Sequence, residues 1–585
     1  MGNDLYYGDN LVVLRESIKD ESIDLVYLDP PFNSQATYNV LFKAPSGEQS
    51  HAQIEAFEDT WHWGDAAQDA FDQVMKSGNT DASEMLRAMH AFLKENDMMA
   101  YLAMMAVRLI ELHRVMKQTA SLYLHSDPTA SHYVKILTDS IFGANNFQNE
   151  IVWKRTTTHS DSMTWSRVAD HLLFYTKTDE FTWHTPRVPH SEEYRSNKYR
   201  YDDHDGRGVY RLDNMTSPNP RPNMMYTWKG FPSPPKGWRF EKPTMQRLDE
   251  EKRIWYPTRP DGSLDTHKRP QFKRYLDAMK GGVMGTVWTD IPPINSQAQE
   301  RLGYPTQKPV ALLERIISSS SNKGDVVLDP FCGCGTAIHA AQKLDRSWIG
   351  IDITHLAISL IEKRLNDAFP GIKYNVHGTP KDLEGARDLA SRDKYQFQWW
   401  AVSLVNAVPF GGKKKGADTG IDGLIYFKNF DADGKVTTER IIVSVKGGET
   451  VGVGMIRDLA HVVARDNAKI GLFLTLTEPT RPMLTEAVKE GYFEAPNGKY
   501  RKIQITTIAD LLDGRKPDLP PIDTTAFSKA KQEPTSQTGL DEAPVLPEDK
   551  RLFPTKGSPS ELRVDLAATT RALRRTRRGG PRRRG

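Results

Sequence analysis

Cysteine is nearly absent from this chain of 585 residues, which contains only Cys332 and Cys334. One residue separates the two thiols, so they lie too close together for an ordinary disulfide. Two cysteines are also too few to build a cysteine-based zinc site. This scarcity excludes a small disulfide-stapled secreted protein and suits a reducing cytosol. The length predicts two or three domains.

Long apolar runs and a strong net charge are also lacking. No run of about 18 apolar residues occurs, which argues against a membrane-spanning helix, and residues 1–4 show no charged and apolar leader. We therefore expect a soluble, cytoplasmic protein without membrane contact. Lys and Arg number 78 against 75 Asp and Glu, which gives a net charge of +3 at pH 7. Any affinity for nucleic acid must come from local basic patches.

The sequence does contain a glycine-rich turn, 329–336, with the residues Asp-Pro-Phe-Cys-Gly-Cys-Gly-Thr. The turn follows the apolar run 326–328 and precedes a helical pattern over 337–344. Strand, glycine turn and helix is the layout of a nucleotide-type cofactor cradle, although the dinucleotide pattern G-x-G-x-x-G is absent. A second predicted strand, 347–351, ends at Asp352, where an acid can accept hydrogen bonds from ribose hydroxyls. Taken alone, such a turn can also serve only to pack the helix on the strand.

A second motif, Asp29, Pro30, Pro31 and Phe32, follows another apolar strand predicted over 23–28. Together the two motifs resemble those of the DNA amino-methyltransferases, which move a methyl group from S-adenosylmethionine to the exocyclic nitrogen of adenine or cytosine. The order, catalytic motif first and cofactor motif last, resembles the permuted β class.

The resemblance covers about residues 1–375. It implies a mixed, mostly parallel α/β sheet of the Rossmann-like methyltransferase type. It also implies double-stranded DNA as the partner and a restriction-modification or related system inside a prokaryotic or phage-infected cell.

The chemistry of the reaction explains the residue types in the catalytic motif. The amino group of adenine is conjugated to its ring, so its lone pair is a poor nucleophile. Asp29 and the carbonyl of Pro30 would accept its two N–H bonds and aim the lone pair at the methyl group. Pro30 and Pro31 restrict the backbone and so pre-position these acceptors. Phe32 offers a face on which a base extruded from the duplex can stack.

The acid at the start of this motif favours N6 of adenine as the acceptor, because the resembled cytosine enzymes more often carry Ser there. Methylation of N4 of cytosine is the alternative within the class. A rival interpretation is a DNA-binding or restriction protein whose methylase half has decayed.

The resemblance assigns further residues to S-adenosylmethionine. Asp329 would bind the methionine ammonium and Asp352 the ribose. Asp9, in the Gly-Asp-Asn turn 8–10, would lie near the adenine; alternatively Asp9 or Asn10 only caps the next helix. The predicted cofactor set comprises Asp9, Thr306, Lys308, Asp329, Phe331, Gly333, Gly335, Thr336 and Asp352.

The segment 303–309 resembles the part of the family that lines the methionine end of the cofactor, and it contains Thr306 and Lys308. A helical stretch follows over 310–318. Thr306 can cap this helix, and Pro309 suits its first turn.

Three spans between the motifs carry further expectations. The span 33–75 mixes polar and aromatic residues and predicts a mobile flap over the target base. In 81–117 the apolar residues recur at helical spacing, which predicts core helices or in part a dimer surface. The strand predicted over 120–127 contains His125 and Asp127, which could form an acid–base pair. Because methyl transfer needs no strong base before attack, we favour a structural or base-pocket role for them.

Between about 179 and 300 the chain becomes rich in Pro, Gly, aromatic and basic residues. Basic residues interleaved with aromatics suit contact with phosphates and bases, and the position matches the target-recognition region of the resembled class. An ordinary irregular insertion is the alternative. Candidate DNA contacts are Arg195, Lys198, Arg200 and Lys229. Tyr175, before this region, could wall the base pocket or belong to the core.

A different unit follows over about 396–513. Asp422 precedes one predicted strand, and Lys446 ends the next. This pattern resembles the PD-(D/E)xK nucleases, specifically the Mrr-like restriction endonucleases. In that family an Asp and a Glu or Gln hold a divalent metal, and the Lys polarises water or phosphate.

Two departures from the nuclease pattern weaken the expectation of cleavage. Ser444 stands where Glu or Gln is expected, and the predicted helix 396–401 lacks the acid often found there. Asp422 is a candidate Mg²⁺ ligand, whereas methyl transfer itself needs no metal. The alternatives are a nuclease-like domain kept for DNA binding, or one that uses a displaced acid such as Asp418.

The last 72 residues, 514–585, are poor in aromatics and rich in Pro, Ser, Thr and charge, which predicts disorder. The arginine cluster at 571–584 suits either a solvated tail or nonspecific attraction to DNA. The predicted plan is a catalytic part over 1–178, a recognition insert over 179–300, a cofactor-binding part over 301–375, a linker over 376–395, a nuclease-fold domain over 396–513 and a basic tail over 514–585.

Overall fold

The contacts in the computed structural model divide the chain into two units, 1–532 and 533–585. The structure describes residues 2–31, 61–158, 163–188, 192–278, 281–295, 298, 300–302, 304, 306–410, 420–430, 436–495, 497–522 and 533, and the backbone alone of 37–43 and 49–58. The predictions made for Phe32, for Asp418 and for the arginine cluster of the tail lie outside the described residues. Among the helices so described, none is long and apolar enough to cross a bilayer.

A nine-stranded sheet organises the N-terminal two thirds of the described chain. Its order is β13-β6-β7-β5-β2-β14-β15-β1-β16. The strands are β1 (Asp4–Tyr7), β2 (Ile23–Leu28), β5 (Met116–Ser126), β6 (Phe147–Lys154), β7 (Ala169–Thr176), β13 (Val287–Trp288), β14 (Val326–Asp329), β15 (Ser347–Asp352) and β16 (Asn375–His377). Within this described sheet, only β7 runs against its neighbours β5 and β6, and the other pairs are parallel. The predicted mostly parallel α/β sheet is confirmed.

Helices cover both faces of the sheet, which explains why its strands are almost continuously apolar. Successive side chains of β2 point to opposite faces: Val26 and Leu28 pack in one cluster, and Leu25 and Tyr27 in the other. The helices of the first face are α1 (Asn10–Glu16), α2 (Asp65–Lys76), α3 (Thr80–Leu93), α4 (Asp97–Val115) and α5 (Ser131–Phe142). The second face is covered by α8 (Val310–Ser320), α9 (Thr336–Lys343) and α10 (His355–Ala368).

The predicted core role of the apolar stripe in 81–117 is confirmed, because α3 and α4 bury it against the sheet. Helix α4 is the more enclosed of the two, with Leu102, Met105, Leu109 and Leu112 fully buried. In the span of the predicted flap, β3 (Thr37–Lys43) and β4 (Gln49–Glu58) pair antiparallel. The motion of this hairpin and its position over a base stay predictions.

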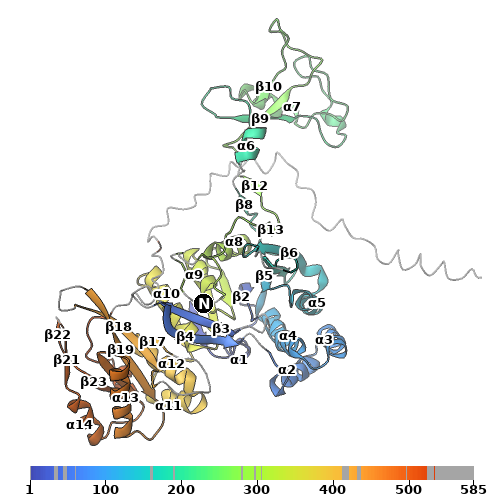
Figure 1. Ribbon diagram of the computed structural model, residues 1–585. Helices are drawn as coiled ribbons and strands as arrows, with labels where there is room; N and C mark the ends of the chain where they lie inside the picture. The colour runs from blue at the N-terminus through green and yellow to red at the C-terminus, as the bar shows by residue number, and fades with distance from the viewer. Residues whose placement is uncertain are drawn as a thin grey trace, which may run out of the picture. The chain divides into compact units, whose positions relative to one another are not determined.

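Strands β2 and β14 lie side by side at the centre of the sheet although they are far apart in sequence, as their blue and yellow-green colours show in Figure 1. From this pair the strand order runs outward in two directions, to β15 and β1 on one side and to β5 on the other. Such a reversal leaves a crevice at the carboxyl ends of the two central strands, where ligands of open α/β sheets bind. The two predicted motifs follow β2 and β14 and therefore meet there.

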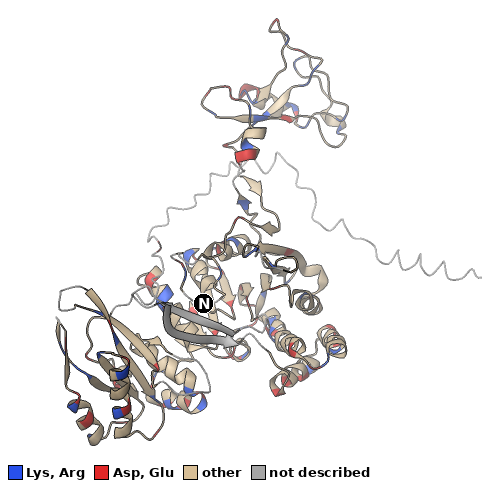
Figure 2. Cartoon of the chain, in the orientation of Figure 1, with Lys and Arg blue, Asp and Glu red and all other residues tan. Residues whose placement is uncertain are grey.

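The predicted recognition insert has secondary structure of its own. Its elements are β8 (Arg187–Val188), α6 (Glu192–Lys198), β9 (Tyr210–Asn214), α7 (Lys242–Glu250), β10 (Ile254–Trp255), β11 (Gln271–Tyr275) and β12 (Gly282–Val283), with a 3₁₀ turn at Pro222–Met224. Strands β10, β11 and β9 form one small sheet, and β12 and β8 form another. In Figure 2 acidic and basic residues mix over this region.

Burial separates the insert's aromatic residues from its basic ones. Trp228, Phe231 and Trp238 are at most 5% exposed and form the insert's own core, and contact between the insert and DNA stays a prediction. The burial of these aromatics has a physical cause, since a small unit without long helices needs large apolar side chains for a core. All four candidate basic residues, Arg195, Lys198, Arg200 and Lys229, are exposed. The fourth candidate, Lys229, forms an ion pair with Asp249.

The C-terminal region forms a second sheet in the order β17-β18-β19-β20-β23. Its strands are β17 (Val408–Pro409), β18 (Gly423–Phe430), β19 (Val436–Lys446), β20 (Ile470–Thr475) and β23 (Ile503–Thr507), which confirms the strands predicted there. The other elements are α11 (Leu383–Arg392), α12 (Lys394–Leu404), α13 (Val453–Arg465), α14 (Arg481–Lys489), α15 (Ile508–Leu512) and the hairpin of β21 (Tyr492–Ala495) with β22 (Gly498–Arg501). Helix α11 occupies much of the span predicted as a linker and packs against α12. The proposed domain boundaries stay predictions.

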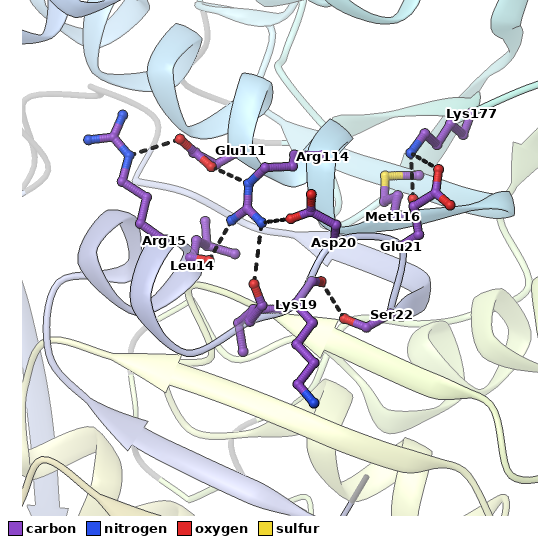
Figure 3. A network of polar contacts seen from close by, with 11 residues as sticks. Leu14, Arg15, Lys19, Asp20, Glu21, Ser22, Glu111, Arg114, Met116 and Lys177 are labelled. Atoms are coloured by element: carbon purple, nitrogen blue, oxygen red, sulfur yellow. Dashed lines mark hydrogen bonds and ion pairs between the residues drawn. The ribbon is translucent and has the colours of Figure 1, made fainter.

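A polar network joins the C-terminal end of α1 to that of α4 (Figure 3). Arg114 donates to the carbonyl oxygen of Leu14 at 2.7 Å and to the carboxylate of Glu111 at 2.7 Å. It also forms an ion pair with Asp20. The last carbonyl groups of a helix have no partner within the helix, so Arg114 satisfies a group that would otherwise remain unpaired.

We predict that Arg114→Met lowers the free energy of unfolding of the N-terminal region by about 1–3 kcal/mol, since it removes a charged donor from a helix-end carbonyl and two carboxylates. Arg15→Met is the matched control. Arg15 shares Glu111 but is 41% exposed, and surface ion pairs contribute about 0–1 kcal/mol. Differential scanning calorimetry of both variants checks the prediction. Equal, small shifts in the two variants would contradict it.

Candidate active site

A cavity of about 390 Å³ lies at the carboxyl ends of β1, β2, β14 and β15. It brings together residues from every motif predicted for the methyltransferase part. The predicted residues that line it are Asp9, Asp29, Pro30, Pro31, Thr306, Lys308, Asp329, Phe331, Gly333, Thr336 and Asp352. The sequence reasoning missed further lining residues, which include Tyr27, Trp61, Met104, Arg108, Tyr304 and Thr354.

Asp29, directly after β2, forms an ion pair with Lys308. The Lys308 ammonium lies 2.9 and 2.7 Å from the two carboxylate oxygens of Asp29 and 3.3 Å from the carbonyl oxygen of Thr306. Both side chains are largely buried, with 18% and 9% of their surface exposed. Lys308 lines the cavity, and its ammonium holds the carboxylate of the predicted catalytic residue. Its contact with the methionine end of a cofactor stays a prediction.

Asp329, the last residue of β14, is buried in the cavity wall with only 3% of its surface exposed. Its carboxylate accepts a hydrogen bond from the N–H of Phe331 at 3.1 Å. Burial, with the nearby charges of Asp29 and Asp352, raises the pKa of Asp329 well above its ordinary value. The cavity thus contains more negative charge than its own lysine compensates.

Asp352, at the end of β15, holds two loops of the cavity together. One carboxylate oxygen accepts the N–H of Gly333 at 2.9 Å. The other accepts the N–H and the hydroxyl of Thr354, each at 2.9 Å. Burial raises the pKa of Asp352 to about 6, although these hydrogen bonds lower it. The glycine turn and the start of α10 are therefore fixed to each other by one carboxylate.

The two glycines of the turn have different roles. Both adopt the left-handed conformation, with φ 50° at Gly333 and 73° at Gly335, which favours glycine. A Cβ on Gly333 would lie 3.1 Å from the ring of Tyr304 in the cavity wall, and a Cβ on Gly335 would lie 2.8 Å from Ile361 of α10. Gly335 does not line the cavity, so its assignment to cofactor contact is replaced by one to helix packing.

The Gly-Asp-Asn turn after β1 caps a helix and also reaches the cavity, and its contact with the adenine of a cofactor stays a prediction. Asp9 caps α1 by accepting the N–H of Leu11 at 2.7 Å, and it also lines the cavity. Asn10 donates to the carbonyl oxygen of Pro330 at 2.9 Å and accepts from Arg108 at 2.6 Å. Arg108, 4% exposed on α4, therefore supports the turn. A charged residue within an apolar helical stripe is unusual, and this position was the sequence signal for a buried role of Arg108.

His125 is buried, but its carboxylate partner is not the one considered from sequence. Tyr27 and His125 are joined by a hydrogen bond of 2.9 Å between the phenol oxygen and Nδ1, and Nε2 lies 3.1 Å from Asp170. Asp127 instead accepts the N–H and hydroxyl of Thr129 before α5. A pair of His125 with Asp127 is therefore wrong, and a structural role for both residues is supported.

Two further expectations are settled by local contacts. Tyr175 is fully buried and donates to Asp139 at 2.7 Å, and it does not line the cavity, so the core interpretation holds. Thr306 does not cap α8, because its φ of 60° places it in a left-handed turn. Pro309 is the N-cap residue, and the carboxylate of Glu300 accepts the N–H of Val310 at 3.1 Å.

In the C-terminal domain, Asp422 lies beside β19. Its carboxylate oxygens accept the N–H of Val445 at 2.6 Å and the side-chain amide of Gln398 at 2.8 Å. Ser444 is buried, and Lys446 ends the strand. Within the described ranges no group of three or more His, Cys, Asp or Glu residues is placed to hold a metal. Among the described positions of the nuclease pattern, Asp422 is the one that carries a carboxylate, which does not by itself fit a Mg²⁺ site.

Comparison with known proteins matches each of these two regions to a protein family. A family model described as DNA methylase matches residues 23–363, and one described as restriction endonuclease matches residues 389–499. The chain is 30% identical to the type II methyltransferase M.EcaI of Enterobacter cloacae over 269 residues, which is 45% of this chain and 57% of that protein. It is 46% identical to the DNA adenine methyltransferase YhdJ of Escherichia coli over 86 residues, 15% of this chain and 29% of that protein.

The matched regions thus span 57% and 29% of the lengths of these two curated relatives. A solved structure of a candidate DNA modification methylase from Thermus thermophilus, complexed with S-adenosyl-L-methionine, aligns over 65% of this chain and 99% of that one. The identity is 16% and the TM-score 0.31, which is too low to support a structural argument. The methylase model covers more than half of the chain, including both motifs of the cavity. The chain belongs to the DNA methylase family and has a restriction endonuclease domain after its methylase region.

Proposed function

We propose that this protein transfers a methyl group from S-adenosylmethionine to the exocyclic amine of a base flipped out of double-stranded DNA, with N6 of adenine as the acceptor. One observation carries the proposal: the catalytic motif after β2 and the cofactor motif after β14 meet in one cavity. The acceptor is supported by the acid at position 29 and by the adenine-specific relative. The restriction endonuclease domain supports a role in a restriction-modification system.

The cavity fits S-adenosylmethionine in size and in charge. Its volume of about 390 Å³ lies within the range of roughly 300–1,000 Å³ for small-molecule sites. The buried Asp329 would hold the ammonium of the cofactor, and Asp352 the ribose hydroxyls. A carboxylate that is buried without a full countercharge favours a cationic ligand. The cofactor supplies a methyl group made electrophilic by a sulfonium.

The residues around Asp29 would orient the amine that accepts the methyl group. The Asp29 carboxylate and the carbonyl oxygen of Pro30 accept hydrogen bonds from the two N–H groups of the amine. The nitrogen lone pair then points to the methyl carbon. The nitrogen would form its bond to the methyl carbon as the carbon–sulfur bonding pair moves to sulfur, and the amine would then release one proton to water. Lys308 fixes the Asp29 carboxylate through two contacts, which pre-positions the acceptor. Stacking of the base on Phe32 stays a prediction.

We predict that Asp29→Ala keeps cofactor binding but lowers methyl transfer at least about a hundredfold, because one oriented acceptor of the amine is lost. Methylation of unmethylated plasmid, followed by mass spectrometry of the nucleosides, checks this and should show N6-methyladenine for the wild type. Asp127→Ala is the matched control, since Asp127 follows the neighbouring β5 and only stabilises a turn. Its transfer rate should stay at the wild-type level.

Three results would change this view. Transfer that survives in Asp29→Ala removes Asp29 from its role. N4-methylcytosine in place of N6-methyladenine keeps the mechanism and overturns the choice of base. Absence of any methylated base, with cofactor bound, favours a DNA-binding or restriction protein with a decayed methylase.

We also predict that affinity for S-adenosylmethionine falls as the pH drops below about 6, the pKa of Asp352. The sign follows from protonation: the carboxylate that accepts hydrogen bonds is present above this pKa and is lost below it. The raised pKa of Asp329 acts in the same direction. Each pH unit below the pKa should weaken binding by up to about tenfold per group. Calorimetric titration at several pH values checks the slope.

Asp352→Asn should bind weakly and show a flatter pH profile than the wild type, because one titrating group is gone. Asp127→Asn should keep the wild-type profile. A wild-type affinity that is constant from about pH 5 to 8 would contradict the assigned role of Asp352, because its pKa of about 6 lies within that range.

The restriction endonuclease domain supports a second candidate function, which is hydrolysis of DNA. Asp422 and Lys446 have the residue types and the order that the resembled nucleases use. Ser444 replaces the expected second ligand, and among the described positions of the nuclease pattern Asp422 is the one that carries a carboxylate. We therefore assign Mg²⁺ to Asp422 only as a candidate and derive no cleavage step from it.

Incubation of plasmid DNA with the protein and Mg²⁺ tests this second function. Cleavage by this domain should disappear in Lys446→Ala and persist in Lys469→Ala, a lysine at the other end of the β19–β20 pair that is paired with Glu439. Cutting that survives in Lys446→Ala comes from another site.

A further inference from the structure

Two large apolar side chains stand exposed in the loop between β6 and β7. Met163 is 98% exposed and Trp165 is 97% exposed. The next most exposed large apolar residue in the described chain is Phe92 at 75%. Full burial of such a side chain contributes roughly 2–3 kcal/mol, and tryptophan gains most from stacking. Exposed apolar surface rimmed by polar residues is a feature of partner-binding sites.

The loop lies on the same edge of the sheet as the cavity. Strand β6 runs parallel to β5 and β2, because both β5 and β6 are antiparallel to β7. The end of β6 at Lys154 therefore emerges at the edge where Asp29 follows β2. Three strand spacings separate the two, or about 14 Å across the sheet. That distance is comparable to the roughly 12 Å width of the major groove of DNA.

Backbone and side-chain contacts fix the base of the loop. The N–H of Arg155 donates to the carbonyl oxygen of Val168 at 2.9 Å. The Arg155 guanidinium forms an ion pair of 3.3 Å with the buried Asp170. Asp170 contacts His125, which is joined to Tyr27 in the cavity wall. A largely buried chain of polar contacts thus connects the loop base to the strand that ends at Asp29.

The residues around the exposed pair suit nucleic acid. Lys154, Arg155 and Arg167 are all exposed, and the sequence from 154 to 168 contains one acid, Asp161, beside several Ser and Thr residues. Arginine, lysine, serine and threonine supply most side-chain contacts to phosphate. An apolar side chain flanked by such residues can enter a base stack.

We propose that Trp165, supported by Met163, inserts into the duplex beside the target base and fills the gap that the flipped base leaves. Lys154, Arg155 and Arg167 then contact the flanking phosphates. This inference rests on the proposed function and adds how the base is extracted: insertion of the indole stabilises the unstacked duplex, while the cavity receives the base. The partner of this loop is therefore double-stranded DNA.

The test compares Trp165→Ala, Trp165→Phe and the control Phe92→Ala, which removes an exposed aromatic residue from α3. Methyl transfer is measured on two duplexes with the site found by sequencing methylated plasmid, one with the target base paired and one with it mispaired. A mispaired base is easier to extrude. Trp165→Ala should lose about tenfold to a hundredfold in kcat/KM on the paired duplex, because unstacking takes a few kcal/mol. Its loss on the mispaired duplex should be much smaller.

Trp165→Phe should retain most of the rate, because it keeps an aromatic wedge, and Phe92→Ala should match the wild type. Equal losses of Trp165→Ala on the two duplexes, or no loss on either, would overturn the proposal. A change of oligomeric state in Trp165→Ala without DNA, measured by light scattering, would overturn it as well and assign the loop to contact between copies.

A binding experiment tests the inference even if the protein transfers no methyl group. If the wild type binds duplex DNA but transfers no methyl group, fluorescence anisotropy with a duplex carrying a one-nucleotide gap decides the inference. The wild type should prefer the gapped duplex over the intact one, since an inserted ring fills the gap, and Trp165→Ala should lose that preference. A preference that persists in Trp165→Ala, or is absent from the wild type, would overturn the inference.

Discussion

The crowding of carboxylates at the carboxyl ends of the central strands is the constraint on which the rest of the site depends. Asp29, Asp329 and Asp352 line one cavity, and burial raises the pKa of the latter two. Charges held this close in a partly dry cavity repel one another. Lys308 compensates for part of this charge, and it reaches Asp29 across 279 positions of sequence. The charged surroundings of both motifs therefore form only when the sheet is complete.

The endonuclease domain contacts the cofactor side of the methylase region through α12. The side chain of Gln396 accepts the N–H of His355 at 3.0 Å, at the start of the helix that follows Asp352. Two positions further along α12, Gln398 donates to Asp422. Tyr304 of the cavity wall and Trp399 of α12 belong to one apolar cluster. The two regions thus share part of an apolar core and are joined by a hydrogen bond of α12.

The features that could be predicted from the sequence are those that depend on neighbouring residues along the chain. The central strands are short apolar runs that end in Asp29, Asp329 and Asp352, and each motif follows its strand at the sheet edge, as α/β topology requires. Contacts between distant segments could not be predicted in this way. Nothing in the local sequence of Lys308 indicates that Asp29 is its partner. Gly335 likewise looks in the sequence like a glycine that lets a ligand come close to the backbone. Its role becomes clear only from the structure, in which Ile361 of α10 packs against it.

The same charge balance suggests why a site of this kind would favour substrate over product. Under the proposed function, Asp329 and its neighbouring carboxylates face a ligand that carries both a sulfonium and an ammonium before transfer, and only the ammonium after it. Loss of one positive charge removes an attraction that is strong in a poorly solvated cavity. Without the sulfonium charge, the carboxylates again repel one another, as they do before a ligand binds. A cavity with excess negative charge therefore binds the methyl donor in preference to its demethylated product, and this difference would help the product to leave.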